Sequence, residues 1–230
     1  MKSVVKTAFI ATIPVLTGYL VLGFGFGILL SAAGYGVIWA LAIALTMYSG
    51  SMQYMAVSLL STGASMLTVA VTTLMVQARH LFYGISMIDK YRGIGKIKPY
   101  LMFAMTDETY SLVCSEPPEG AKANLKLYYF CVSIMNHCYW ISGCVLGSLV
   151  GTLFPFRSDG IDFVLTALFL TIFTEQWLTN PDHRPALIGL GSSVLCLAIF
   201  GAESFLIPTM LVIASLLLLI RKPKKKEENA

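Results

Sequence analysis

The sequence has few charged residues and no extended polar region. Only 12% of its 230 residues are Asp, Glu, Lys or Arg, whereas 57% are hydrophobic and the mean hydropathy is +0.75. A soluble domain carries roughly 25% charged residues, so this composition excludes an ordinary soluble protein. It predicts an all-α integral membrane protein with a single polytopic transport domain over residues 1–230.

Motifs of catalysis and metal binding are also missing. The five cysteines stand singly in apolar runs, which excludes a CxxC metal site or a disulfide framework. The sequence contains no GxxxxGK[ST] loop for nucleotide phosphates, no HExxH and no GxSxG. We therefore expect no enzyme activity, no cofactor, no metal ion and no nucleic-acid partner.

Long apolar runs account for most of the chain. About 20 apolar residues span a bilayer, and the runs predict about seven transmembrane helices. Residues 100–114 are too short to cross, and they predict a re-entrant or half helix, with an amphipathic helix at the membrane surface as the alternative. The predicted crossings cover residues 8–31, 37–60, 64–87, 128–154, 161–178, 185–200 and 205–220.

Polar residues interrupt the second apolar run at its middle. The stretch ALTMYSGSMQY, residues 44–54, places hydroxyls and an amide around a glycine. This composition is typical of an interrupted helix that presents backbone groups to a polar ligand. The residues expected to bind substrate here are Tyr48, Ser49, Gly50, Ser51 and Gln53.

A similar stretch recurs late in the chain. FLTIFTEQW, residues 169–177, repeats the order of hydroxyl, amide and aromatic residues and adds an acid. VLGFGFG at position 21 and VLGSLVG at position 145 match at an offset of 124 residues. We therefore predict two repeats, over about residues 8–88 and 127–200.

Charge bias gives these repeats opposite orientations. The basic loop over residues 90–98 and the basic tail over residues 221–230 mark the cytoplasmic side. If residues 100–114 do not cross, the chain makes seven crossings with its N-terminus outside. We therefore predict inverted three-helix repeats with interrupted helices, although Lys2 and Lys6 then lie outside, against the charge rule.

Charged residues also occur inside the third apolar run. Burying an arginine at the bilayer centre costs about 2.5 to 3.5 kcal/mol, so such a residue usually faces a partner or water; snorkelling to the surface is the alternative. We expect Arg79 and Tyr83 to bind substrate and His80 to take part in ion coupling. Arg79 is also expected to pair with a substrate carboxylate, with Asp107 or with Glu108.

The late polar stretch supplies the first candidate for proton coupling. An acid buried in a membrane has a raised pKa and can titrate near neutrality, which favours Glu175. Asp107 and Glu108 are further candidates for coupling, and Thr174 and Gln176 are expected to bind substrate.

Glycines recur in the first and fifth apolar runs. Small residues one turn apart let helices pack closely, and in the first run a helix break that lines a cavity is the alternative. The residues expected at helix breaks or packing faces are Gly23, Gly25, Gly27, Gly143, Gly147, Gly151, Asn136 and Trp140.

Taken in order, these stretches resemble the AzlC family of branched-chain amino acid permeases. The resemblance implies the large subunit of a bacterial two-component exporter that works with a small AzlD-like membrane subunit. Gln77 departs from the asparagine expected before the Arg-His pair, and Gly50 follows Ser49 where alanine is commoner. The likeness is carried by LGFGFG, YSGSMQY, QARHLFY, TDETY, residues 136–140 and TEQW, between about Pro14 and Trp177.

The sequence therefore predicts a secondary active exporter of branched-chain and other hydrophobic amino acids in the bacterial cytoplasmic membrane. We expect an ion gradient, of protons, to drive it. A passive channel for small amino acids and a non-transporting partner subunit of a membrane complex are the alternatives. Flux through the reconstituted chain, with and without the small subunit, separates these three functions.

Overall fold

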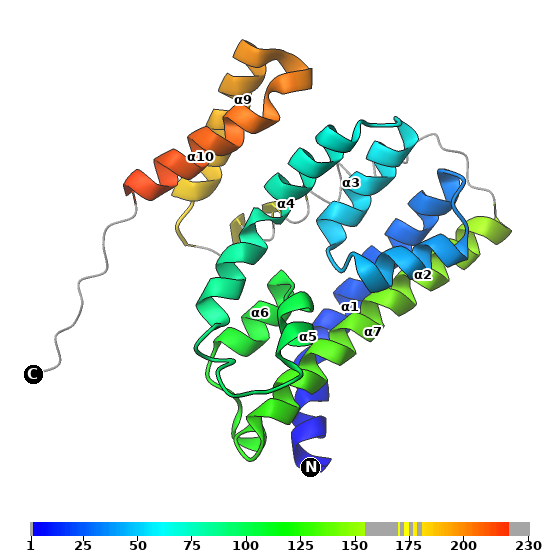
Figure 1. The fold of residues 1–230 in the computed structure, drawn as a ribbon, viewed down its shortest axis with the longest axis vertical. Coiled ribbons are helices and arrows are strands. Elements are labelled where there is room, and N and C mark those ends of the chain that lie inside the picture. Colours follow the sequence, from blue (N-terminus) through cyan, green and yellow to red (C-terminus); the bar gives the residue numbers. More distant parts are fainter. Residues whose placement is uncertain (1, 155–169, 171–172, 175–176, 179–180, 221–230) are drawn as a thin grey trace, which may run out of the picture. The chain divides into compact units, whose positions relative to one another are not determined.

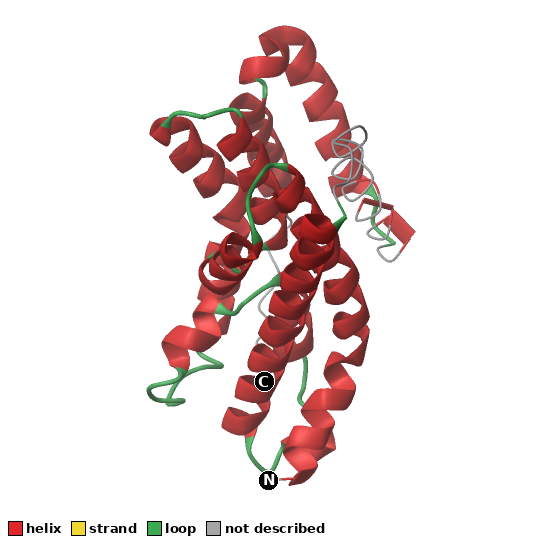
Figure 2. Cartoon of the chain, turned by 90° about the vertical axis from the view of Figure 1, so that its right-hand side faces the viewer, coloured by secondary structure: helices red, strands yellow, loops and turns green. Residues whose placement is uncertain are grey.

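A computed structural model describes the chain except for residues 1, 155–169, 171–172, 175–176, 179–180 and 221–230. The described residues form helices joined by loops, and they contain no strand (Figure 2). The chain divides into two compact units, Met1–Val164 and Leu165–Ala230, each of which is described by itself.

Two long helices form the frame of the first unit. α1 (Lys2–Ala32) and α7 (Leu125–Leu153) are both long and apolar enough to cross a membrane. Their backbones touch where glycines remove the side chains: a Cβ at Gly143 would lie 2.8 Å from the carbonyl oxygen of Tyr19. α1 is continuous through its glycines, so these residues pack helices together and do not break the helix.

The two long helices run in the same direction (Figure 1). Tyr19 contacts Gly143, and further along both helices Ile28 contacts Gly151. The inverted arrangement predicted opposite directions for the helices that begin the two repeats, and this expectation is wrong. The error arose because residues 37–60 were counted as a crossing.

That second apolar run folds back on itself. α2 (Val37–Thr46) and α3 (Gly50–Ser61) are separated by three non-helical residues, as the polar interruption predicted. Helices of 10 and 12 residues extend only about 15 to 18 Å at 1.5 Å per residue. Neither is long enough to cross a bilayer by itself.

Contacts with the long helices fix the direction of each half of this hairpin. α2 starts just beyond the end of α1 and returns along α7, where the carbonyl of Ala44 lies 3.2 Å from Nε2 of His137. α3 then runs in the direction of α1, because Tyr48 lies beside Tyr19 and Tyr54 lies beside Phe26. Residues 37–61 are therefore a hairpin and not one interrupted crossing helix.

A second hairpin follows α4 (Met66–Met87). Where one re-entrant or half helix was predicted, the structure has two short helices, α5 (Lys98–Phe103) and α6 (Asp107–Cys114). The Nζ of Lys90 donates to the carbonyl of Cys114 at 2.9 Å, so α6 returns to the loop from which α5 begins.

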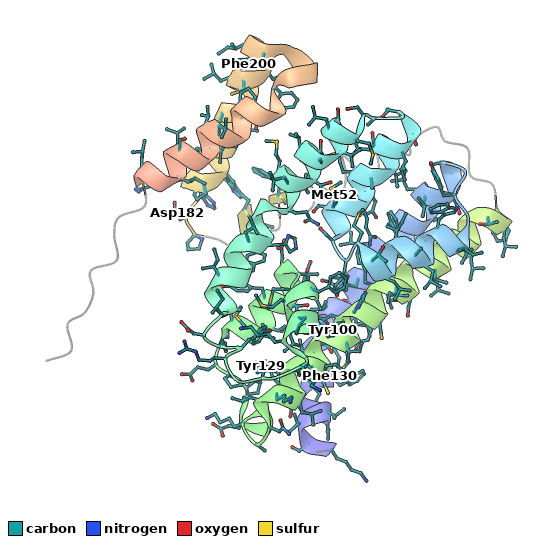
Figure 3. All side chains as sticks on the ribbon, in the orientation of Figure 1. Met52, Tyr100, Tyr129, Phe130, Asp182 and Phe200 are labelled. Atoms are coloured by element: carbon teal, nitrogen blue, oxygen red, sulfur yellow. The ribbon has the colours of Figure 1, made fainter. Side chains whose placement is uncertain are left out.

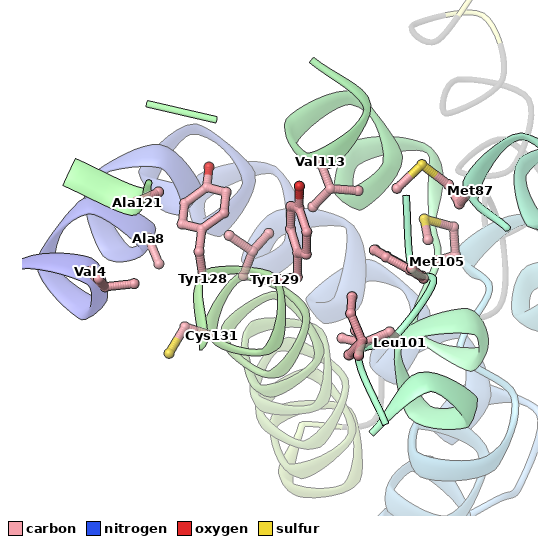
Figure 4. Close-up of a cluster of buried hydrophobic side chains, with 13 residues drawn as sticks. Val4, Ala8, Met87, Leu101, Met105, Val113, Ala121, Tyr128, Tyr129 and Cys131 are labelled. Carbon is pink, nitrogen blue, oxygen red and sulfur yellow. The ribbon is translucent and has the colours of Figure 1, made fainter. Parts of the chain in front are cut away.

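A buried apolar cluster holds this hairpin against the first halves of α1 and α7 (Figure 4). Val4 and Ala8 of α1 and Tyr128 of α7 share the cluster with Leu101 of α5 and Val113 of α6, and all five are almost completely buried. The N-terminus of α1 and the basic loop after α4 therefore lie at the same end of the first unit.

The described helices of the second unit are α9 (Arg184–Ser204) and α10 (Leu206–Ile220). They match the last two predicted apolar segments, and residues 184–201 are long and apolar enough to span a membrane. The sixth predicted segment, residues 161–178, falls largely outside the described residues.

Candidate functional site

The two hairpins meet at the middle of the α1–α7 pair. We call residues 47–49 the first tip and residues 104–106 the second tip. The ring centroids of Tyr48 in the first tip and of Phe103, the residue directly before the second tip, are 6.4 Å apart. Both rings contact His137 of α7, at 4.3 and 5.9 Å. Because α3 and α6 begin directly after the tips, two helix N-termini with free N–H groups start in this region.

Aromatic side chains of α5 extend this contact along α7. Tyr100 lies next to Phe130, with 6.0 Å between their ring centroids (Figure 3). Its hydroxyl lies 3.3 Å from Nδ1 of His137, whose other ring nitrogen reaches the carbonyl of Ala44. His137 therefore joins both hairpins to α7.

Gln53 fixes the shape of the first tip. Its Nε2 donates to the carbonyl of Met47 at 2.5 Å, and its Oε1 accepts from Nε1 of Trp140 at 3.0 Å. The last carbonyls of a helix lack helical partners, and the buried amide of Gln53 satisfies one of them. Both polar atoms of this amide thus form hydrogen bonds within the protein, although the sequence suggested a contact with substrate.

The other polar residues of the first tip lie at the start of α3. Ser49 is the N-cap residue of α3, and its hydroxyl donates to Oε1 of Gln77 on α4 at 2.9 Å. Gly50 packs on the indole of Trp140, since a Cβ there would lie 2.9 Å from the ring. Ser51 is half-buried in the first turn of α3. Tyr48, Ser49, Gly50 and Ser51 therefore lie at the start of α3, and their contact with substrate stays a prediction.

Hydroxyl groups hold the second tip. Thr106 caps α6, because its Oγ1 accepts from the backbone N–H of Thr109 at 3.2 Å. The hydroxyl of Tyr19 lies 2.6 Å from this same Oγ1 and 2.7 Å from Oε2 of Glu108. Asn136 of α7 donates to Oγ1 of Thr109 at 3.1 Å.

Two buried polar atoms next to the tips have no hydrogen-bond partner among the described residues. They are the hydroxyl of Tyr48, a residue that is 5% exposed, and Oδ1 of Asn136, a residue that is fully buried. Buried polar groups are normally hydrogen-bonded. These two atoms therefore indicate where the polar group of a ligand would fit.

α4 brings a further group of predicted residues to one side of α6. Tyr83 stacks on Tyr110, with ring centroids 4.6 Å apart, and His80 contacts Tyr83 edge-on. Asp107 is half-buried in the first turn of α6. The side chain of Arg79 lies outside the described part of the structure, so its pairing with an acid stays a prediction.

The late polar stretch belongs to the second unit. Glu175 and Gln176 lie outside the described residues, and Thr174 is exposed and donates to the carbonyl of Leu170 at 2.8 Å. Trp177 stacks on His183 at 4.1 Å, beside a groove of about 630 Å³ that Phe173 also lines. The proposed equivalence of this stretch with the first tip stays a prediction.

Three residues of the tip region were missed by sequence reasoning. Thr106 and Thr109 lie in TDETY, where only the two acids, Asp107 and Glu108, were assigned a role. Tyr19 gave no signal, because it is one aromatic residue in a long apolar run. Among the described residues, no group of three or more His, Cys, Asp or Glu could hold a metal ion.

Known proteins are similar to this chain over most of its length. The sequence model of a family described as AzlC protein matches residues 14–154. The branched-chain amino acid transport protein AzlC of Bacillus subtilis is 42% identical over 224 residues, 97% of this chain and 87% of that protein. An uncharacterized membrane protein of Helicobacter pylori J99 is 41% identical, over 94% of this chain and 95% of its own.

A more distant relative is the inner membrane protein YgaZ of Escherichia coli K12. It is 22% identical over 207 residues, which cover 87% of this chain and 82% of that protein. No solved structure matches the chain.

Proposed function

This chain belongs to the AzlC family and is a multi-pass membrane protein, and we propose that it is a secondary active exporter of branched-chain and other hydrophobic amino acids in the bacterial cytoplasmic membrane. One observation carries the proposal. Two hairpin tips, each followed by a helix N-terminus, meet among buried polar groups at the middle of two membrane-length helices. Transporters bind small polar head groups at such interrupted helices.

The substrate is a zwitterion with an apolar side chain. Its carboxylate suits the free N–H groups at the start of α3, beside Tyr48, Ser49, Gly50 and Ser51. The aromatic rings of Tyr48 and Phe103, at the first tip and directly before the second, provide an apolar surface for its side chain. Gln53 supports this site by holding the first tip in shape.

Further predicted site residues complete the proposal. Arg79 and Tyr83 of α4 are proposed to contact the substrate from a third helix. Thr174 and Gln176, which belong to the second unit, are likewise proposed to bind substrate. Proton entry drives export, and Glu175 is the first candidate to carry the proton; Asp107, Glu108 and His80 are the other candidates.

Membrane orientation follows from the charge rule applied to the hairpin fold. Because the N-terminus of α1 shares a buried cluster with Tyr91 and Ile94 of the basic loop, Lys2 and Lys6 lie on the same side as that loop. Basic residues mark the cytoplasmic side, so we place the N-terminus inside. We further propose that a small AzlD-like membrane subunit completes the transporter.

Liposome flux tests this function. The chain is reconstituted with and without the small subunit, and leucine, isoleucine and valine are followed under an imposed pH gradient. Uphill movement of these amino acids is expected only with the gradient. Movement that never exceeds equilibration would indicate a passive channel, and equal flux with and without this chain would indicate a non-transporting subunit.

A substitution in the second unit tests the first candidate for coupling. Glu175→Gln is expected to abolish pH-driven export while substrate binding persists. Glu119→Gln is the matched control, because Glu119 is 86% exposed and pairs only with nearby Lys122 among the described residues. Unchanged coupling in Glu175→Gln would remove Glu175 from the proposal without affecting the transport function itself.

A further inference from the structure

The geometry points to Glu108 as a carboxylate that binds a proton in this conformation, and to Thr109 as the group that binds the substrate's ammonium only after that proton is lost. Proton and amino acid then exclude each other, as antiport requires. The inference rests on the proposed export of amino acids, and it assigns roles to Tyr19, Thr106 and Thr109 in linking the two events.

Four oxygen atoms form a continuous series at the second tip. Oε2 of Glu108 lies 2.7 Å from the hydroxyl of Tyr19, which lies 2.6 Å from Oγ1 of Thr106. Thr106 in turn donates to Oγ1 of Thr109 at 3.0 Å. The three hydroxyl residues are 4%, 7% and 0% exposed, respectively, so water does not readily replace these partners.

A count of hydrogens separates the two protonation states of Glu108. Each hydroxyl supplies one hydrogen. Thr109 accepts in its contact with Thr106, so only Tyr19 and Thr106 supply hydrogens to the series, two for the three contacts. If Glu108 is ionised it only accepts, and Tyr19 must donate to it. Thr106 can then serve the short contact with Tyr19 or its bond to Thr109, but not both.

A proton on Glu108 supplies the third hydrogen. Glu108 then donates to Tyr19, Tyr19 donates to Thr106, and Thr106 donates to Thr109, as its geometry requires. Every contact in the series is filled. The described conformation therefore fits the protonated carboxyl better than the ionised one.

Loss of this proton changes what Thr109 offers to a ligand. In the protonated state its Oγ1 accepts from both Thr106 and Asn136, which uses both lone pairs. When Glu108 is ionised, Thr106 rotates its hydrogen toward Tyr19, and one lone pair of Thr109 opens. No covalent bond changes apart from the O–H bond that Glu108 loses as its proton leaves.

The opened lone pair lies where a ligand is already indicated. Oδ1 of Asn136 and the hydroxyl of Tyr48 are buried and have no hydrogen-bond partner among the described residues. An ammonium group needs up to three acceptors, and Thr109 and Asn136 supply two of them in the ionised state. In the protonated state only Asn136 remains, so binding weakens.

No described cation neutralises Glu108. Within the described residues, Glu119 pairs with Lys122 and Asp182 pairs with Arg184, whereas Glu108 is hydrogen-bonded to Tyr19. The titratable or charged groups on the elements around it are Tyr19 on α1, Tyr48 at the first tip, Arg79, His80, Tyr83 and Lys90 on or after α4, Asp107 and Tyr110 on α6, and His137 on α7.

Binding of leucine at different pH values tests the inference without transport. In the purified full chain with its small subunit, leucine affinity is expected to fall by up to about tenfold per pH unit once Glu108 is protonated. Leucine added to weakly buffered protein in that range should release protons. Glu108→Gln, which mimics the protonated acid, should bind weakly at every pH and release none.

Two further changes interrupt the series at its other members. Tyr19→Phe keeps the ring but removes the hydroxyl, so affinity should lose its pH dependence and binding should release no protons. Thr109→Val should weaken binding throughout, and Thr109→Ser should restore the wild-type profile. Tyr110→Phe is the matched control, because Tyr110 meets Tyr83 and Ser86 outside the series.

Infrared spectroscopy gives a readout that does not depend on leucine affinity. The protonated carboxyl C=O band that disappears when leucine binds should be absent from Glu108→Gln. A wild-type pH profile in both Glu108→Gln and Tyr19→Phe would overturn the inference. If Tyr19→Phe does not fold, equal profiles of Thr109→Val and Thr109→Ser would overturn it instead. Failure of the wild-type complex to bind or move any hydrophobic amino acid would reject the proposed function.

Discussion

The two hairpins hold their tips in place with different hydrogen-bonding groups. Both place a break in a short helix against the middle of the α1–α7 pair. The first tip is neutral and is held by the amide of Gln53, whereas the second is followed by Asp107 and Glu108 and is held by hydroxyls. An amide has fixed donors and acceptors, but a hydroxyl can reverse its donor direction.

This difference assigns different tasks to the two tips. At the first tip, turning the amide of Gln53 around would break its hydrogen bonds to a backbone carbonyl and to Trp140, so the tip keeps one shape. At the second tip, rotation of hydroxyl hydrogens exchanges one bonded arrangement for another. The first hairpin is therefore fixed, whereas the hydrogen bonds of the second can rearrange. Three substitutions, in order of decreasing expected effect, test this difference.

The largest effect is expected from a change that removes the support of both hairpins. Gly147→Val would place side-chain atoms against the backbone of Phe24, where even a Cβ overlaps the carbonyl. Forcing α1 and α7 apart should cost more than about 3 kcal/mol of unfolding free energy, measured by unfolding in detergent. Gly18→Ala, on α1, has no atom near its new Cβ and should change stability by less than about 1 kcal/mol. Equal stability of the two variants would contradict the parallel α1–α7 contact.

An intermediate effect is expected at the first tip alone. Gln53→Leu removes a buried amide, leaving the Met47 carbonyl and Nε1 of Trp140 without these partners. The loss should be about 2 kcal/mol in detergent unfolding. Trp140→Phe and the double variant complete a mutant cycle, in which a positive coupling energy is expected. Simple additivity would show that the amide does not hold the tip through Trp140.

The smallest effect is expected where the second hairpin returns to the basic loop. Lys90→Met removes the ammonium that binds the carbonyls of Cys114 and Ser115 at the end of α6. A cation at a helix C-terminus contributes about 0.5 kcal/mol, so hydrogen exchange over residues 107–114 should become modestly faster. Lys96→Met in the same exposed loop should leave this exchange unchanged. Equal exchange in both variants would show that Lys90 does not fix the hairpin.

Most helices could be located from the sequence, because length and hydropathy are local properties. The polar interruption at residues 47–49 and the last two apolar segments were predicted close to their positions. The direction of the second apolar run was not, since a broken crossing helix and a hairpin have the same composition. That single error changed the parity of the crossings and gave α1 and α7 opposite directions.

The candidate site was predicted only in part, for a related reason. Polar residues in apolar runs pointed to Tyr48, Ser49 and Glu108, because such residues are costly in a membrane. They did not show that Gln53 would be used within the protein, or that Tyr19 would reach Glu108.

The sequence by itself therefore determined the class of protein, the positions of its apolar helices and the two polar stretches that interrupt them. Tertiary structure alone decided that both stretches are hairpin tips and that they meet. The bond from Trp140 to Gln53 joins residues 87 positions apart, and the bond from Tyr19 to Glu108 joins residues 89 positions apart. Hydropathy and helical period act within one helix, whereas these partners depend on how close glycines allow α1 and α7 to approach each other.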